Sequence, residues 1–156
     1  MIDLISQFEE VRLVYRNKTR AHDRPKVNCA SKAFDIFHQI WDKDQIGLVE
    51  ECKLLLLDRQ LRLMSLANIS YGGMTEAIID PRMVFAIALK RRAHNIILAH
   101  NHPTGSLQPS EADKALTRRI TFLGEMMRIQ LGDHLIVTRE GYRSIVSDEC
   151  GSLENG

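Results

Sequence analysis

The sequence has few cysteines and no long apolar segment. Its three cysteines do not form a Cys-x-x-Cys pair, which argues against a disulfide framework and against a thiolate metal site. No apolar run approaches the roughly 20 residues that a membrane-spanning helix needs. The N-terminal residues also lack the basic start and apolar centre of a signal peptide. We therefore expect a cytoplasmic protein that does not contact a membrane.

The chain also has almost no net charge. A formal charge of +1 gives it no overall attraction to nucleic acid or to an anionic membrane. Two short basic stretches, at residues 16–26 and 90–92, are typical of solvated surface. The hydrophobic content of 44% is ordinary for a globular protein, and 156 residues suffice for one domain with a real core. We expect one globular domain that does not bind nucleic acid through this chain alone.

The most informative stretch is LAHNHPTGSLQPSEAD, residues 98–113. A short apolar run leads into His100 and His102, which predicts the end of a buried strand with both histidines on one face. A proline and a glycine then indicate a tight loop, after which Ser110 is expected as the N-cap of a helix with Asp113 in its first turn. Two imidazoles and one carboxylate with an open fourth position are the ligands typical of catalytic zinc.

Each half of this stretch also has a simpler interpretation. A histidine pair at a strand end can be polar surface. Ser110-x-x-Asp113 resembles a helix capping box, although that motif favours Glu or Gln at its last position. Both halves together, joined by a tight loop, favour the metal site.

The remaining pattern predicts an α/β domain, because helical and strand patterns alternate along the chain. The expected elements are a strand over 10–15, a helix over 31–41 capped by Asn28 or Ser31, a hairpin of 48–57 and 61–69, a helix that begins at Pro81 with Asp80 as its N-cap, a buried strand over 96–99, a helix from Ser110 to about Gln130 that Gly132 ends, and a closing hairpin of 135–137 and 142–146.

The spacing of apolar residues predicts which face of each helix is buried. The predicted faces are Ala33, Phe34, Ile36, Phe37, Ile40 and Trp41 in the first helix, Met83, Val84, Ile87, Ala88 and Ala93 in the second, and Ala112, Ala115, Leu116, Ile120, Leu123, Met126 and Met127 in the third.

The spacing of His100, His102, Ser110 and Asp113 resembles the JAMM signature of MPN-type metalloproteases. The surrounding residues, His-Asn-His-Pro-Thr-Gly, resemble the RadC branch of that superfamily, in which serine is more usual at the position of Thr104. The substitution keeps a hydroxyl group.

The resemblance covers about residues 45–147 and implies a fold. We expect a single MPN/JAB domain of the α/β class, with a curved mixed β-sheet flanked by helices as in cytidine deaminases. Residues 1–44 would form an N-terminal strand and helix packed on this domain, and residues 148–156 a flexible tail.

The same resemblance implies roles for individual residues. His100, His102 and Asp113 would hold one Zn²⁺ ion per chain. Glu50 begins the pattern Glu-x-Cys-x-x-Leu-x-Leu-Asp, which is similar to the RadC segment that carries the catalytic glutamate, with Cys52 where an aromatic residue is more usual. Glu50 would then be the general base, and Ser110 would donate a hydrogen bond to the oxyanion.

Three further residues have alternative roles. Glu51 is adjacent to Glu50 but faces the other side of a strand, so only one of them can face the site. His134 matches a RadC position and could be a polar group near the site or a hydrogen-bonded structural histidine. His94 enters from the opposite end of the strand that carries His100, so we expect it to be a helix-end residue.

The implied function is hydrolysis of an amide bond, in a peptide or an isopeptide. A zinc deaminase is a weaker candidate, because the required His-x-Glu and Pro-Cys-x-x-Cys motifs are absent. A non-catalytic MPN scaffold is a second candidate, and a DNA-repair role, which is traditional for RadC proteins, is a third. Longer members resemble a fusion with an N-terminal helix-hairpin-helix module, which we do not expect here. The expected partner is a protein or peptide substrate. The sequence leaves the oligomeric state open, although exposed strands of a curved sheet can pair two copies of the chain into a homodimer.

Overall fold

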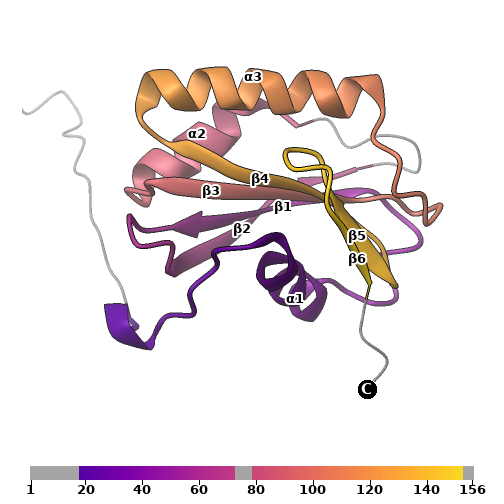
Figure 1. Cartoon of the computed structure of the whole chain (residues 1–156), viewed down its shortest axis with the longest axis horizontal. Helices are drawn as coiled ribbons and strands as arrows, with labels where there is room; N and C mark the ends of the chain where they lie inside the picture. The colour runs from indigo at the N-terminus through magenta and orange to yellow at the C-terminus, as the bar shows by residue number, and fades with distance from the viewer. Residues whose placement is uncertain (1–17, 73–78, 153–156) are drawn as a thin grey trace, which may run out of the picture.

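A six-stranded sheet separates one helix from two others in the computed structural model (Figure 1). The structure describes residues 18–72 and 79–152. No helix within these ranges is long and apolar enough to cross a membrane. In chain order the elements are η2 (Ala21–Asp23), α1 (Ala30–Ile40), β1 (Glu51–Leu57), β2 (Leu63–Tyr71), α2 (Pro81–Lys90), β3 (Asn95–Asn101), α3 (Glu111–Met127), β4 (Gln130–Val137), β5 (Gly141–Ser144) and β6 (Cys150–Ser152).

The sheet is mixed, with strand order β2-β1-β3-β4-β5-β6. Strand β1 runs antiparallel to both β2 and β3, whereas β3 and β4 are parallel. Parallel neighbours need a crossover connection, and α3 supplies it. This arrangement confirms the prediction of a single α/β domain with a mixed sheet flanked by helices.

Both faces of the central strands β1 and β3 are buried. Side chains alternate between these faces. On the α1 face, Leu55 packs with Phe34 and Phe37, whereas Leu54 packs with Ile120 on the face covered by α2 and α3 (Figure 1). The position of a residue along β1 or β3 therefore decides which core it enters.

Most of the predicted elements are confirmed. The first helix, the β1–β2 hairpin, the buried strand and the closing hairpin are present. The start of α2 is also as expected, because Pro81 is its first residue and the Asp80 side chain accepts a hydrogen bond from the Arg82 N–H. The predicted cap of α1 was wrong: Cys29 is its N-cap, and the Asn28 side chain instead accepts from Lys32 Nζ.

The predicted end of α3 was also wrong. The helix ends at Met127, and Arg128 follows with φ 55°, in the left-handed region. The Ile129 N–H then bonds to the Gly124 carbonyl at 2.9 Å. Gly132, expected to end the helix, lies inside β4. The helix stops early because Ile129 must reach the core between the sheet and the two helices.

The buried face of α3 is narrower than the predicted one. It consists of Thr117, Ile120 and Gly124, with Leu116 and Leu123 packed beside it. Thr117 is buried although it is polar, because its hydroxyl group is hydrogen bonded. The predicted members that are exposed are Ala112, Ala115, Met126 and Met127.

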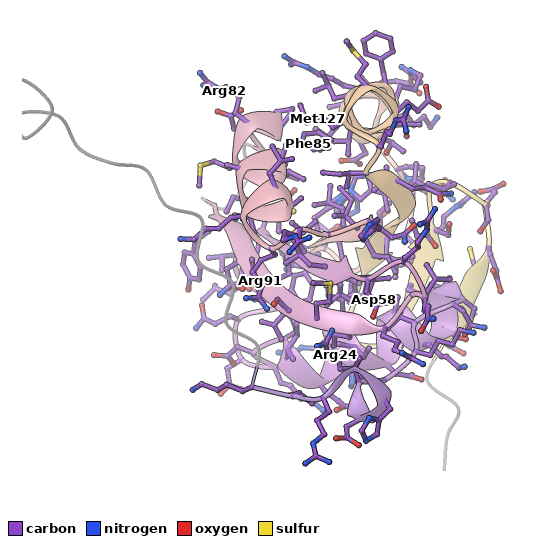
Figure 2. All side chains as sticks on the ribbon, turned by 90° about the vertical axis from the view of Figure 1, so that its left-hand side faces the viewer. Arg24, Asp58, Arg82, Phe85, Arg91 and Met127 are labelled. Carbon is purple, nitrogen blue, oxygen red and sulfur yellow. The ribbon has the colours of Figure 1, made fainter. Side chains whose placement is uncertain are left out.

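The buried face of α2 differs from the prediction and also includes Pro81. Phe85 is buried, whereas Met83 is 50% exposed. Figure 2 shows Phe85 on the side of α2 that faces α3. There its ring lies over Gly124, where a β-carbon would be 3.7 Å from Phe85 Cζ. Contact between the two helices, rather than contact with the sheet alone, decides which α2 side chains are buried.

Two sequence expectations concern the ends of the chain. The strand expected over 10–15 lies outside the described residues. Part of the expected C-terminal tail, Cys150–Ser152, forms strand β6 and pairs with β5.

Candidate metal centre

Three side chains expected to bind a metal meet where β3 ends and α3 begins. His100 lies in β3 and is 1% exposed, His102 follows the strand, and Asp113 lies in the first turn of α3. His100 Nε2 is 3.0 Å from His102 Nε2 and 3.2 Å from Asp113 Oδ1. His102 Nε2 is 3.6 Å from Asp113 Oδ2. One potential ligand atom from each residue lies within 4.8 Å of the others.

Hydrogen bonds from Asn101 fix the end of β3. The residue is fully buried, and its side chain lies on the other face of the sheet from His100. Its Nδ2 donates to the carbonyls of Ile46 and Val49, and its Oδ1 accepts from the Glu51 N–H at 2.7 Å. These bonds tie the segment before β1 to the histidine strand, so the two histidines project from a rigid base.

The hydrogen bond of His102 to the backbone determines its tautomer. Its Nδ1 lies 2.8 Å from the Ser106 carbonyl oxygen. A carbonyl oxygen can only accept, so Nδ1 carries the proton. In a neutral ring the lone pair is then on Nε2, which faces His100 and Asp113. The loop thus holds His102 in the tautomer whose Nε2 can bind a cation.

The electrostatics of the cluster favour a positive charge. Although burial alone would raise it, the neighbouring His100 and His102 rings hold the pKa of the Asp113 carboxyl well below its usual range. The hydrogen bond to Asp113 raises the pKa of His102, against the effect of burial. Two imidazole nitrogens and a carboxylate this close repel one another unless a proton or a cation lies among them. The donor set fits zinc.

Asp113 also completes a helix capping box. Ser110 Oγ accepts from the Asp113 N–H at 3.1 Å, and Asp113 Oδ2 accepts from the Ser110 N–H at 2.7 Å. Its other oxygen, Oδ1, is the atom closer to His100. The two interpretations of this motif are therefore not exclusive, because one carboxylate caps α3 and faces the histidines.

The two neighbouring glutamates lie on opposite sides of the sheet. Glu51 is buried, and its Oε2 lies 2.8 Å from Lys53 Nζ, which in turn lies over the Trp41 ring on the α1 face. Cys52 is the register partner of His100 and belongs to the opposite core. Because side chains alternate, Glu50 is on the face of Cys52 and His100.

The negative charge of Glu50 affects the pKa values of Cys52 and His102. Burial raises the pKa of the Cys52 thiol, and the negative charge of Glu50 raises it further. The same charge adds to the raised pKa of His102, behind the larger effect of Asp113. Glu50 is thus near the histidine pair, whereas Glu51 is paired with Lys53.

His134 is a hydrogen-bonded structural histidine rather than a member of the ligand cluster. Its Nε2 lies 3.0 Å from His100 Nδ1, and its Nδ1 lies 2.7 Å from Thr117 Oγ1. Burial lowers its pKa well below the usual value, so the ring is neutral. Thr117 was not among the residues predicted from the sequence, although its place one turn after Asp113 could have suggested it. His94 is exposed after the end of α2, as expected.

Most of the chain is similar to known proteins. Residues 27–151 match the family model described as the RadC-like JAB domain. A UPF0758 protein of Flavobacterium johnsoniae is 38% identical over 125 residues, which cover 79% of this chain and 52% of that protein. One from Finegoldia magna is 47% identical over 90 residues, which cover 58% of this chain and 40% of that protein.

The chain spans about half the length of the curated relatives it matches. The family model nevertheless covers most of the chain and includes both the ligand cluster and Glu50. This chain belongs to the RadC-like JAB domain family.

Proposed function

We propose that this chain is a zinc-dependent hydrolase that cleaves amide bonds in a peptide or isopeptide substrate. The convergence of His100, His102 and Asp113 on one point carries the proposal. Two neutral imidazoles with one carboxylate leave a coordination position open, which is the arrangement of catalytic rather than structural zinc sites. Glu50, on the same face of the sheet, supplies the base that hydrolysis needs.

Each residue has a defined task in this reaction. His100, His102 and Asp113 would hold the ion, and zinc, when bound, lowers the pKa of water to about 7 and polarises the substrate carbonyl. Glu50 would take a proton from the attacking water and deliver it to the leaving amine. Ser110 Oγ already accepts from the Asp113 N–H, so its own proton is free to stabilise the oxyanion. Donors of this type contribute roughly 3 kcal/mol to catalysis.

Substitutions at the site test metal binding and chemistry separately. Protein purified without added zinc should contain close to one zinc per chain, measured by elemental analysis. His102→Ala should lose the metal, because it removes a ligand. Glu50→Gln should keep the metal and lose turnover of a peptide or isopeptide that the wild-type chain cleaves, because an amide cannot act as the base.

Glu51→Gln is the matched control, since the neighbouring carboxylate lies on the opposite face of the sheet. It should retain both zinc and turnover. Retained turnover in Glu50→Gln would remove that residue from the mechanism. A wild-type chain without zinc after reconstitution would instead favour a non-catalytic scaffold.

A further inference from the structure

A chain of hydrogen bonds runs behind the metal cluster, through two side chains that are not ligands. His134 is fully buried in β4, with its Nε2 3.0 Å from His100 Nδ1 and its Nδ1 2.7 Å from Thr117 Oγ1. Thr117 Oγ1 also lies 2.8 Å from the backbone carbonyl oxygen of Asp113. The chain thus begins on the backbone of one ligand and ends on the ring of another.

The direction of every hydrogen bond in this chain follows from the first one, between Thr117 and the Asp113 carbonyl. The Asp113 carbonyl can only accept, so the single hydroxyl proton of Thr117 is donated to it. Thr117 Oγ1 must then accept from His134 Nδ1–H. A charged ring is disfavoured at a fully buried position, so His134 Nε2 carries a lone pair.

The last bond of the chain fixes the tautomer of His100. Because His134 Nε2 accepts, His100 Nδ1 must donate to it. Its proton is then on Nδ1, and its lone pair on Nε2 points toward His102 and Asp113. The opposite tautomer would let Nε2 donate to Asp113 Oδ1 at 3.2 Å, but it would leave His134 Nε2 without a donor, and its proton would block the binding of an ion.

We propose that Thr117 and His134 are positioning residues that hold His100 in the tautomer able to bind a metal. The role of this tautomer in metal binding rests on the function proposed above, but the tautomer itself is a property of the metal-free chain. Hydrogen bonds to the second ring nitrogen of a histidine ligand fix its orientation and raise its basicity.

The tautomer can be measured on the metal-free protein by long-range ¹H–¹⁵N correlation spectroscopy of its histidines. His100 should show a protonated Nδ1. Thr117→Val, which has nearly the same shape but no hydroxyl group, should abolish this preference, and Thr117→Ser should restore it. Thr121→Val is the matched control, because Thr121 Oγ1 makes the same bond to the carbonyl four residues earlier, that of Thr117.

Zinc affinity, measured by competition with a chelator, gives the second readout. Thr117→Val should bind zinc about 10- to 100-fold more weakly than the wild type, the usual loss when a supporting hydrogen bond is removed. Thr117→Ser and Thr121→Val should stay within a few-fold of it.

The two proposals fail in different ways. A wild-type His100 with its proton on Nε2 would overturn the positioning role, whatever the protein binds. Equal tautomer populations and zinc affinities in Thr117→Val and the wild type would also overturn it. A protonated Nδ1 that Thr117→Val abolishes, in a chain that binds no zinc, would support the tautomer assignment while the hydrolase proposal fails.

Discussion

At the scale of single residues, Asp133 has a buried carboxyl group. It directly precedes His134, which belongs to the chain of hydrogen bonds behind the metal cluster. Burial raises the pKa of Asp133, although the Ser144 hydroxyl and the His134 N–H both donate to its carboxylate. A carboxyl whose pKa is higher in the folded state binds more protons there than in the unfolded state. Its contribution to stability therefore falls as the pH rises from the ordinary value of 3.8 through the raised folded value.

Asp133→Asn should remove this pH dependence, because an amide oxygen can still accept both hydrogen bonds but carries no charge. Relative to the wild type, the variant should gain stability as the pH rises from 3.8 toward neutrality. Urea unfolding at several pH values measures the difference. A difference that stays constant across this range would show that Asp133 does not titrate as described.

The three candidate ligands could be predicted from the sequence, and His134 was identified through the family resemblance, but its hydrogen bond to His100 could not be predicted. His100, His102 and Asp113 come from one strand end and the following helix turn, so local spacing was enough. His134 reaches His100 only because β4 pairs in parallel with β3. No local pattern encodes that pairing.

At the scale of single elements, the end of α3 depends on Gly124. A β-carbon there would lie 2.3 Å from the Ile129 carbonyl oxygen, a backbone atom that cannot move aside cheaply. Gly124 therefore allows the chain to turn back closely after Arg128, so that β4 can start at Gln130.

Gly124→Ala should lower the free energy of unfolding by about 1–3 kcal/mol, the usual cost of forcing an extra carbon into a packed site. Gly132→Ala is the control, because a β-carbon there would be 3.6 Å from the nearest atom. Chemical denaturation of both variants provides the measurement. An equal decrease in the free energy of unfolding of the two variants would contradict the role of Gly124.

The start of α3 was predictable, whereas its end was not, and its buried face was predicted only in part, at Leu116, Ile120 and Leu123. Ser110 and Asp113 cap the helix through their own side chains, which the sequence displays directly. The end depends on tertiary packing, since Ile129 must enter the core. Met126 is apolar but 71% exposed, so apolar spacing alone gave too wide a face.

At the scale of the whole molecule, the ligand cluster joins the sheet to the helix that crosses over it. His100 belongs to β3 and Asp113 to α3, and these elements form the parallel crossover to β4. An ion bound between them would stabilise the folded chain only, because the unfolded chain does not hold the ligands together.

Zinc should therefore raise the unfolding temperature of the metal-free protein. At a free concentration 100-fold above Kd, it adds about 2.7 kcal/mol to the free energy of unfolding. For a chain of this size, that corresponds to a shift of roughly 5–10 °C. Differential scanning calorimetry with and without zinc measures this shift. His102→Ala should show almost none, and a similar shift in both proteins would place the stabilising ion elsewhere.

The order of helices and strands was predictable, but the order of strands within the sheet was not. Alternating patterns along the chain indicated an α/β domain, and a short turn indicated that β1 and β2 pair. The position of β1 between β2 and β3 depends on contacts between distant residues, such as Cys52 with His100. Those contacts bring Glu50 to the side of the histidines.

The capping box also affects how sequences of this family should be interpreted. Ser110 and Asp113 stabilise the first turn of α3 with or without an ion. Selection for stability would therefore still retain both residues in a relative that no longer carried out the proposed hydrolysis. The Nε2 atoms of His100 and His102 take no part in this cap and instead face each other and Asp113. Under the proposed function, a loss of hydrolysis during evolution should therefore appear first at these two positions, which makes the histidine pair the better marker of a member that retains the site.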